Sequence, residues 1–365
     1  MIYVSDGIIL SKELFIFHKK ISERNVNMFD ISKKENLIIY LTEKGMIKQD
    51  SAYKIHYCSG GVSCTVAYVV IDDKHLIIKQ ALEQLKTKDV WLCDPNRMFI
   101  EYESNRIYYK LMPNNAPKTY FYDDENYIYG REAVPDGCLM WKDYLMKNDL
   151  NFSHAVQAVD TLVIAHNECH GDEEVIENFS DKEVFYNLRI SPYLEFTASK
   201  HKEIAEFTNR ICKILMDSKI SLIHGDYSPK NIMIMDDVVK VLDYEVACYG
   251  HPAFDLAFFT NHFILKAVLF DEFTVGYLAL ADVIVSRYFR QMNYMDKVEF
   301  ESDYVKILAL LMLARVDGKS PVEYLVGKDD KQELVRKMSL EMISRDISTY
   351  KEVKSIINNN LIKEN

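Results

Sequence analysis

The sequence predicts an α+β fold in which a small antiparallel β-sheet lobe precedes a larger, mainly helical lobe. Short strand-like runs fill the first third of the 365 residues, whereas apolar residues recur at helical intervals from about Trp141 onward. We expect an N-terminal extension over residues 1–31, an N-lobe over 32–133 and a C-lobe over 134–365.

The N-lobe is expected to open with a helix and continue as antiparallel strands. Apolar residues have helical spacing within residues 33–44. Strand-like runs follow at residues 53–58, 63–71 and 75–82. A Gly-Gly pair separates the first two runs and an Asp-Asp-Lys turn separates the last two, so we expect hairpins at both places.

The C-lobe is expected to be helical over residues 151–170, 198–217 and the tail beyond Asp282. Its longest apolar stretch, residues 251–270, is interrupted by Asp255 and three other polar residues. That interruption predicts a buried helix rather than a membrane span.

Composition restricts the possible partners and the compartment. The formal net charge of −11 argues against binding nucleic acid and suits a cationic or neutral small substrate. The seven Cys show no CxxC spacing, which predicts reduced thiols in a cytoplasmic protein. The first twenty residues lack the basic and apolar regions of a signal peptide.

Three polar residues are expected to meet around a hairpin in the segment 221–245. Strand-like runs at residues 232–235 and 238–242 are separated by an Asp-Asp pair, which predicts a two-residue turn. Pairing across this turn would place Asn231 opposite Leu242 and beside Asp243 at the open end of the hairpin.

Oxygen ligands at that spacing indicate a site for a hard cation. Mg²⁺ prefers one or two carboxylates together with waters and nucleotide phosphates, which Asn231 and Asp243 would suit. Asp226 lies five residues before Asn231 across a loop stiffened by Pro229, so its carboxylate could accept a hydroxyl proton. The alternative for each residue alone is that it caps a turn or ends a strand.

The motifs of this segment resemble a known family. "HGDYSPKN" matches the H-x-D-x-x-x-x-N catalytic loop of the protein kinase-like superfamily. "LDYEVACYGHPAFDLAF" is similar to the D-x-E segment and following helix of the aminoglycoside phosphotransferase, choline kinase and methylthioribose kinase group. Protein kinases carry D-F-G there instead. "KQAL…W…DPNR…E" upstream resembles methylthioribose kinases in particular, and the whole resemblance covers roughly residues 32–324.

The resemblance implies a bilobal protein kinase-like fold and ATP-dependent phosphoryl transfer to a hydroxyl of a small molecule. Asp226 would be the catalytic base, and Asn231 and Asp243 would hold Mg²⁺. Glu245 would assist them if the strand continues, because it would then point the same way as Asp243. An aminoglycoside-, amino alcohol- or sugar-like acceptor is implied, as is a monomer or homodimer without a membrane or nucleic-acid partner.

The N-lobe is implied to hold ATP. A glycine turn would cover the phosphates, a strand Lys would bridge them, and a helix Glu four residues after Arg97 would hold that Lys. Glu103 is the alternative partner for the Lys, and adenine would bind to backbone groups that follow a strand. The implied nucleotide-binding residues are Ser59, Gly60, Gly61, Ser63, Lys79, Glu101, Glu132, Ala133 and Val134.

Four further residues are implied in support of the site. His224 and Asp255 resemble residues that brace the catalytic loop, and Lys230 lies beside it. Arg315 either faces the acceptor or belongs to a helix end with solvated charges. Residues 187–194 are a second candidate wall of the acceptor site.

Other functions remain open at this point. A pseudo-kinase that binds nucleotide without turnover would be expected to lose Lys79, Asp226, Asn231 or Asp243, and all four are present. A methylthioribose kinase proper is the second alternative. A protein kinase would need D-F-G and a longer activation segment, and a metallohydrolase would need more ligands at metal spacing.

Overall fold

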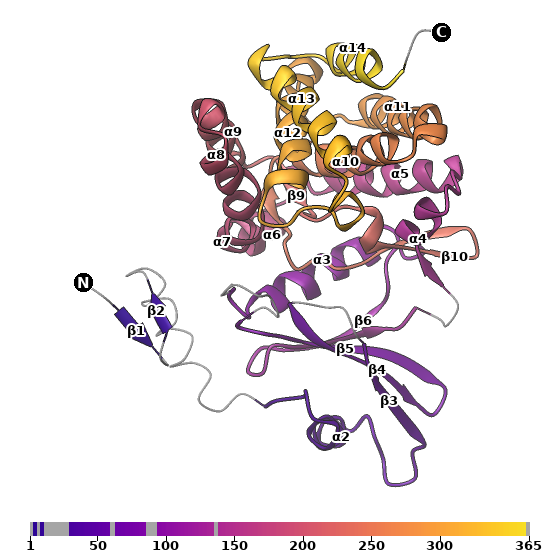
Figure 1. Cartoon of the computed structure of the whole chain (residues 1–365). Coiled ribbons are helices and arrows are strands. Elements are labelled where there is room, and N and C mark those ends of the chain that lie inside the picture. Colours follow the sequence, from indigo (N-terminus) through magenta and orange to yellow (C-terminus); the bar gives the residue numbers. More distant parts are fainter. Residues whose placement is uncertain are drawn as a thin grey trace. The chain divides into compact units, whose positions relative to one another are not determined.

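The computed structural model describes residues 3–5, 8–10, 29–58, 63–84, 93–134 and 138–362. The chain divides into two compact units, which can be followed by colour in Figure 1. The first unit comprises Met1–Tyr102 and Thr119–Ala133, and the second comprises Glu103–Lys118 and Val134–Asn365.

The first unit is built on a five-stranded antiparallel sheet with the order β3-β4-β5-β7-β6. Its strands are β3 (Tyr53–Tyr57), β4 (Cys64–Ile71), β5 (Lys74–Ala81), β6 (Thr119–Asp123) and β7 (Ile128–Glu132). The expected turn joins β4 to β5, since Ile71 pairs with Lys74 and Asp72 takes a positive φ of 52°. A separate pair of short strands, β1 (Tyr3–Ser5) and β2 (Ile8–Leu10), is also antiparallel.

Helix α2 (Lys34–Glu43) covers one face of this sheet. Its Leu37 and Leu41 are fully buried in a cluster with Val69 of β4 and Ile78 of β5. Apolar residues recur about every 3.6 positions along the helix, which gives it one apolar face. In the strands every second side chain points to the buried face of the sheet. Packing of these two faces holds the helix on the sheet. The helix expected within residues 33–44 is confirmed.

Helix α3 (Arg97–Leu111) begins in the first unit and is tied to two strands by a buried arginine. Arg97 donates hydrogen bonds to the carbonyl oxygens of Ser63 and Leu82, which flank β4 and β5. It also donates to the Cys93 carbonyl at 3.0 Å. These bonds fix the start of the helix, and Glu101 lies on the same face one turn later.

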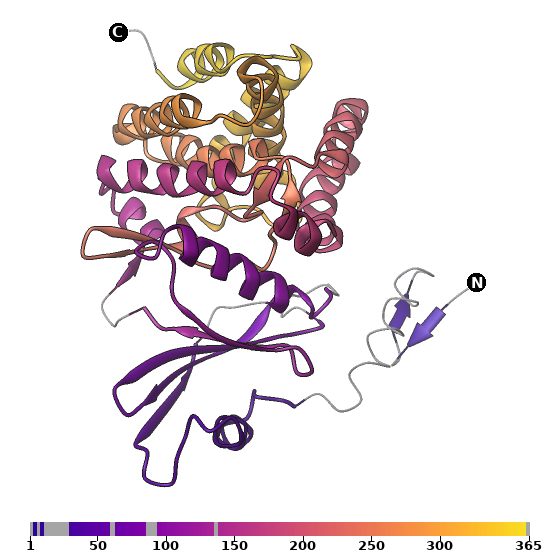
Figure 2. The same cartoon turned by 180° about the vertical axis from the view of Figure 1, so that it is seen from behind.

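The second unit is mainly helical, and Figure 2 shows its helices from behind. The longer helices are α5 (Phe152–Glu168), α9 (Ala205–Asp217), α10 (Ala253–Leu269), α11 (Thr274–Gln291), α12 (Lys297–Asp317), α13 (Asp329–Ser344) and α14 (Tyr350–Leu361). The shorter ones are α4 (Trp141–Met146), α6 (Glu173–Phe179), α7 (Glu183–Phe185), a π-helix (Tyr186–Glu195) and α8 (Phe196–Lys200). Single 3-10 turns occupy Lys202–Ile204, Pro229–Asn231, Asp271–Phe273 and Glu323–Leu325.

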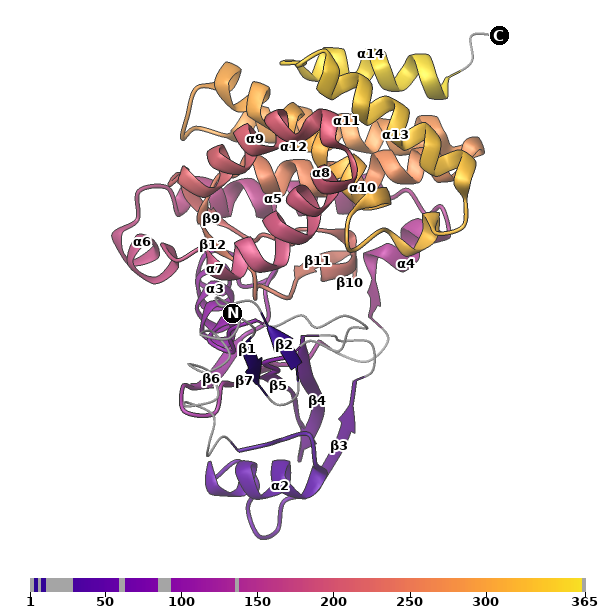
Figure 3. The ribbon, with the colours of Figure 1, turned by 60° about the vertical axis from the view of Figure 1, so that its left-hand side comes forward.

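Helix α10 forms the core of this unit. Nearly all of its residues are buried, and it packs against both α11 and α12 (Figure 3). The apolar stretch at residues 251–270 is therefore a buried helix, as expected. Within the described residues we find no helix whose length and hydropathy would let it cross a membrane.

Two small sheets in the second unit carry the central motif. Strands β10 (Ile232–Met235) and β11 (Val238–Val241) pair antiparallel with Met235 opposite Val238, and β8 (Leu139–Met140) joins β10. Asp236 and Asp237 take φ values of 49° and 59°, the combination that a tight two-residue turn requires. Strand β9 (Ser221–Ile223) pairs with β12 (Cys248–Gly250). The predicted α+β class and the predicted hairpin are both confirmed.

Candidate active site

A loop between β9 and β10 carries the central motif, residues 224–231. Gly225 takes a φ of 73°, and a Cβ at this position would lie 2.5 Å from the Val246 carbonyl oxygen. Any other residue would be strained here, so glycine is needed to let the loop turn against the segment after β11. The turn brings Asp226 back beside its neighbours in the motif.

Asp255, in the first turn of α10, braces this loop. Its carboxylate accepts hydrogen bonds from the backbone N–H of His224 at 2.6 Å and of Gly225 at 2.8 Å. His166 Nε2 lies 3.2 Å from the same carboxylate. Asp255 is fully buried, so these bonds satisfy a charge that would otherwise be costly inside the protein.

His224 fixes the loop from within. Its Nδ1 accepts the Asp226 amide at 3.2 Å, which assigns the proton to Nε2, and Nε2 donates to the Leu242 carbonyl at 3.1 Å. Burial lowers the pKa of His224, although the charges of Asp255 and Asp226 oppose this. The ring is therefore a neutral structural link between the loop and the residue before Asp243.

Asp226 is the most heavily contacted carboxylate of the site. Its Oδ1 lies 2.9 Å from Arg189 Nη2, and its Oδ2 lies 2.9 Å from Lys230 Nζ. Asn231 Nδ2 donates to Oδ2 at 2.8 Å. Burial raises the pKa of Asp226, but the charges of Arg189 and Lys230 outweigh it and hold the pKa below its ordinary value. Asp226 is thus a buried carboxylate that stays ionised at neutral pH.

Arg189 was not identified from the sequence, although it lies inside the candidate wall 187–194. It comes from the π-helix Tyr186–Glu195 and is buried. Besides Asp226 it contacts the Gly225 carbonyl, to which Nε donates at 2.6 Å. Burial lowers the pKa of Arg189, and the charges of Asp226, Glu245 and Asp243 raise it above the ordinary value. The available signal was that Arg189 is the single charged residue within 187–194.

The hairpin brings Asn231 to the residues that follow β11. The Leu242 amide donates to the Asn231 carbonyl at 2.9 Å, which is the predicted pairing. Asn231 Nδ2 donates hydrogen bonds to the Asp226 carbonyl and to its Oδ2. The amide oxygen of Asn231, the atom that would bind a cation, therefore points away from Asp226. Asp243, the residue after Leu242, takes a positive φ of 69°.

That left-handed residue corrects the geometric argument for Glu245. Strand β11 ends at Val241, so the alternation that would have pointed Asp243 and Glu245 the same way does not apply. Glu245 is nevertheless buried and its charge acts on Arg189. Among the residues that the structure describes, no group of three His, Cys, Asp or Glu side chains is placed to hold a metal by itself.

In the first unit Lys79 and Glu101 form the expected pair. Lys79 Nζ lies 2.7 Å from Glu101 Oε1, and both side chains are buried. Glu103 instead contacts Arg106 at 2.8 Å, so it is not the partner of Lys79. The Ser63 carbonyl accepts hydrogen bonds from Arg97 and from the Leu82 amide. Ser59, Gly60 and Gly61 lie outside the described residues.

The expected adenine-binding stretch follows β7. Glu132 pairs with Leu76 of β5, and the Ala133 amide donates to the His75 carbonyl at 3.0 Å. The Ala133 amide is therefore already used in the sheet, and a hydrogen bond to adenine would have to come from another backbone group, such as one of Val134. The adenine contact itself stays a prediction.

Lys230 and Arg315 were each open to interpretation as a charge that only contacts solvent. The structure shows contacts with protein groups for both. Lys230 is half exposed yet pairs with Asp226. Arg315 is buried in the last turn of α12, where Nη1 donates to the Tyr193 hydroxyl at 2.9 Å. Gly318 does end this helix, but the charge of Arg315 is not solvated, so that part of the helix-end interpretation is wrong.

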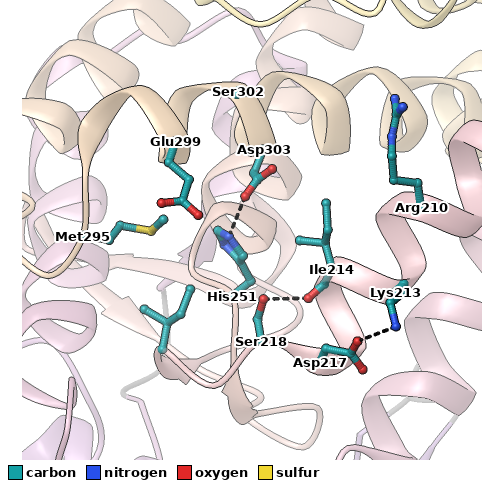
Figure 4. Close-up of a pocket in the computed structure, with 11 residues that line it drawn as sticks. Arg210, Lys213, Ile214, Asp217, Ser218, His251, Met295, Glu299, Ser302 and Asp303 are labelled. Atoms are coloured by element: carbon teal, nitrogen blue, oxygen red, sulfur yellow. Dashed lines mark hydrogen bonds and ion pairs between the residues drawn. The ribbon is translucent and has the colours of Figure 1, made fainter.

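A separate pocket of about 620 Å³ opens on the helical unit, and Figure 4 shows its lining. Two polar pairs lie within its lining: His251 Nε2 is 3.1 Å from Asp303, and Lys213 is 3.2 Å from Asp217. None of the predicted catalytic or nucleotide-binding residues lines it.

Comparison with known proteins identifies relatives of this site. Residues 185–295 match the phosphotransferase enzyme family. The chain is 23% identical over 237 residues to methylthioribose kinase 1 of Oryza sativa subsp. japonica, covering 56% of this chain and 55% of that enzyme. It is 23% identical over 270 residues to a methylthioribose kinase of Bacillus cereus, covering 66% of this chain and 67% of that enzyme. The matched region thus spans about half the length of the rice enzyme.

Solved structures share the fold at low sequence identity. A choline kinase from Cryptosporidium parvum gives a TM-score of 0.55 at 13% identity, covering 88% of this chain and 100% of that chain. An ethanolamine kinase from Plasmodium vivax gives a TM-score of 0.52 at 13% identity, covering 94% of this chain and 98% of that chain. An amicoumacin kinase in complex with AMP-PNP and Ca²⁺ gives a TM-score of 0.51 at 11% identity, covering 91% of this chain and 97% of that chain. These likenesses confirm the predicted kinase-like fold.

The motif from which the relationship was inferred lies inside the matched region. So do Arg189, which pairs with Asp226, and Asp255, which braces the loop. Residues 185–295 thus match the phosphotransferase enzyme family, and the chain is a distant homologue of the methylthioribose kinases.

Proposed function

We propose that this protein transfers the γ-phosphoryl group of ATP to a hydroxyl of a small molecule. The match of residues 185–295 to the phosphotransferase enzyme family supports the reaction class, and the amicoumacin kinase solved with AMP-PNP supports an adenine nucleotide as donor. In the reaction the bond between the γ-phosphorus and the β-phosphate oxygen breaks. A new bond forms from the acceptor oxygen to phosphorus, and ADP leaves.

The ionised carboxylate of Asp226 is the observation that carries this proposal. It is 4% exposed, and Asn231 holds Oδ2 in one orientation. A carboxylate in this state can accept the hydrogen bond of an acceptor hydroxyl and so direct the oxygen toward phosphorus. It then takes the hydroxyl proton as the new bond to phosphorus forms.

The two cations beside Asp226 determine when the proton moves. Arg189 and Lys230 lower the pKa of Asp226 in spite of its burial, which makes it a weak base toward a free hydroxyl. Proton transfer therefore becomes favourable only once the acceptor oxygen has begun to bond to phosphorus and has become strongly acidic. Asp226 therefore contributes mainly by orienting the acceptor hydroxyl toward phosphorus, as expected for phosphoryl transfer.

The residues around the hairpin fit a magnesium ion. Asn231 has an amide oxygen directed away from Asp226, and Asp243 supplies a carboxylate from the adjoining segment. Two such ligands suit Mg²⁺, which keeps several waters and binds phosphate oxygens. When bound, the ion would neutralise charge on the transferring phosphates. We propose Asn231 and Asp243 as ligands and Glu245 as a nearby acidic group.

The first unit is proposed to bind ATP. Lys79 would contact the phosphates, and the 2.7 Å contact with Glu101 would keep its side chain extended. Ser63, with Ser59, Gly60 and Gly61, would cover the phosphates, and backbone groups within 132–134 would bind adenine. The Lys79–Glu101 contact is the support for this assignment.

Measurement of ADP release tests the proposal. Purified protein is given ATP, Mg²⁺ and a panel of sugars, amino alcohols, hydroxy acids and aminoglycosides. The wild type should release ADP with at least one acceptor, and Asp226→Asn should reduce kcat by about 10³-fold or more while ATP still binds. Lys213→Met, at an exposed site on α9, is the control. Full activity of Asp226→Asn would show that the assignment is wrong.

A further inference from the structure

Three basic side chains lie buried in the helical unit beside the proposed active site. Arg315 comes from the last turn of α12, and His262 and Lys266 come from α10. Their exposed fractions are 6%, 6% and 2%. Burying basic groups is unfavourable unless they are paired with an anion or with hydrogen-bond acceptors.

This cluster is continuous with the surroundings of Asp226. The ring of Tyr193 lies 5.6 Å from the guanidinium of Arg189 and 5.4 Å from that of Arg315. Arg189 pairs with Asp226, so one aromatic ring links the catalytic carboxylate to the buried cluster. Burial raises the pKa of Tyr193, but the charges of Arg315, Arg189 and Lys230 lower it below the ordinary value. The local potential is therefore positive.

The partners of these groups are incomplete. Arg315 uses Nη1 for the Tyr193 hydroxyl and the Ser320 carbonyl, whereas its Nε is buried without a hydrogen bond. His262 Nε2 is likewise buried without one, and Lys266 Nζ reaches only the His262 carbonyl at 3.4 Å. Within the described part of the chain, neither Arg315 nor Lys266 forms an ion pair with a carboxylate.

A structural role accounts for only part of this arrangement. The Arg315 contact with Ser320 stabilises the turn after α12, and Lys266 lies 4.7 Å from the ring of Tyr324. Those contacts leave the Nε of Arg315, the Nε2 of His262 and the hydroxyl of Tyr324 unused and buried. An apolar core would have been the less costly way to fill this space.

We infer that the acceptor carries an anionic group, a carboxylate or phosphate, which binds Arg315 and Lys266 while its hydroxyl is presented to Asp226. His262 and Tyr324 supply further hydrogen bonds to this group. The inference rests on the proposed function and specifies its substrate class. It also reverses the expectation drawn from the net charge, because the potential at Tyr193 is positive whereas the chain carries −11 overall.

Protonation of Lys266 supports the same assignment. Burial lowers its pKa to about 7, with Glu323 opposing the shift and Arg315 and Lys142 adding to it. His262, one turn away, has its pKa lowered well below the ordinary value by burial and by Lys266, Arg315 and Lys230. A bound anion would favour the charged form of Lys266, so acceptor affinity should fall as the pH rises through 7.

A matched panel of acceptors is the first test. Glycerate is compared with glycerol, gluconate with glucose, and choline serves as the cationic compound. The anionic member of a reacting pair should have a kcat/KM at least about tenfold higher than the neutral one, the effect of a single buried charge contact. Preference for the neutral or cationic compounds would overturn the inference while leaving phosphoryl transfer intact.

Inorganic phosphate is a probe that needs no knowledge of the acceptor. With saturating Mg²⁺ and ADP present, phosphate should raise the midpoint of thermal unfolding of the wild-type protein, and the rise should be smaller at pH 8.5 than at pH 6. Arg315→Met and Lys266→Met should lose most of this rise, whereas the exposed Lys213→Met should keep it. Absence of any rise in the wild type, or its survival in both variants, would overturn the inference.

The variants also separate this inference from the proposed function. With an anionic acceptor, Lys266→Met should raise the acceptor KM about tenfold or more and remove its pH dependence near 7, while the KM for ATP stays unchanged. Arg315→Lys covers the case in which Arg315→Met does not fold. Activity that survives Asp226→Asn would contradict the proposed function, and an unchanged acceptor KM in the Lys266 and Arg315 variants would contradict only the anionic acceptor.

Discussion

Arg189 Nη2 lies 2.9 Å from Asp226 Oδ1, while Nε of the same guanidinium donates to the Gly225 carbonyl at 2.6 Å. One side chain thus holds both the carboxylate and the backbone of the residue before it. The rigid fork of a guanidinium allows this, whereas an ammonium would contact only one of the two. Arg189 therefore sets both the position and the charge of the proposed catalytic group.

Replacing Arg189 should move the pH profile of the reaction. Arg189→Met removes the larger of the two cationic effects that oppose the burial of Asp226, so the pKa of Asp226 rises and the acid limb of kcat/KM moves to higher pH. Arg189→Lys should show a smaller displacement. An acid limb that stays in place in Arg189→Met would contradict this role.

The same variant should lose stability. In the wild type the lowered pKa of Asp226 contributes stability above the carboxyl's unfolded pKa, and that contribution is lost as the pH falls through the folded pKa. Removing one partner of a buried pair costs about 3–5 kcal/mol at pH 7. Urea unfolding measures the loss. Arg210→Met, which breaks the exposed pair with Asp346, should cost about 1 kcal/mol or less.

Asp255→Asn should weaken the loop that carries Asp226. The amide can accept only at its oxygen, so its NH₂ would face one of the two N–H donors of His224 and Gly225. The variant loses charge-assisted hydrogen bonds and leaves one backbone N–H donor unsatisfied. Together these changes should lower the free energy of unfolding by about 2–4 kcal/mol. Denaturant unfolding checks this value. Asp296→Asn, at the N-cap of α12, should cost little because Asn caps equally well.

The Lys79–Glu101 pair allows structure and function to be separated. Lys79→Met leaves Glu101 charged and buried, and should be destabilising by about 3–5 kcal/mol. The double variant Lys79→Met/Glu101→Leu should recover most of that stability, because no buried charge remains. Its KM for ATP should stay raised. Recovery of ATP affinity in the double variant would show that the pair serves the fold alone.

Lys266→Met should stabilise the protein. Its folded pKa of about 7 is below the unfolded value, so the wild type loses stability as the pH falls from about 10.5 to 7. The variant should gain about 1–4 kcal/mol at pH 6.5 and almost nothing near pH 10. Urea unfolding at the two pH values measures the difference. Lys213→Met provides the comparison, and an equal gain in both variants would contradict the burial argument.

The sequence predicted most accurately the features that local chemistry determines. The Asp-Asp turn set the register of β10 and β11, and hence the proximity of Asn231 and Leu242. Helical spacing likewise placed Glu101 on the face that contains Arg97, and the family resemblance implied its contact with Lys79. In each case the two partners are joined by one or two elements whose geometry follows from a short stretch of chain.

Lys230 and Arg315 were named from the sequence, but the other cations, Arg189 and Lys266, could not be predicted in that way. Arg189 and Tyr193 lie in a π-helix, whose i→i+5 hydrogen bonds leave no period in the sequence that would distinguish it from an α-helix. Lys266 and Arg315 come from different helices, and their approach depends on how α10 packs against α12. The left-handed backbone at Asp243 also had no advance signal, which is why the strand alternation assumed for Glu245 does not apply.

The positive φ of Asp243 has an evolutionary consequence. Asn is the side chain that tolerates this backbone as well as Asp does, and it differs from Asp by one base in the codon. The backbone conformation therefore does not oppose the substitution that removes the charge at this position. With Asp243 as the proposed metal ligand, inactive paralogues of this chain should therefore carry Asn here more often than any other residue.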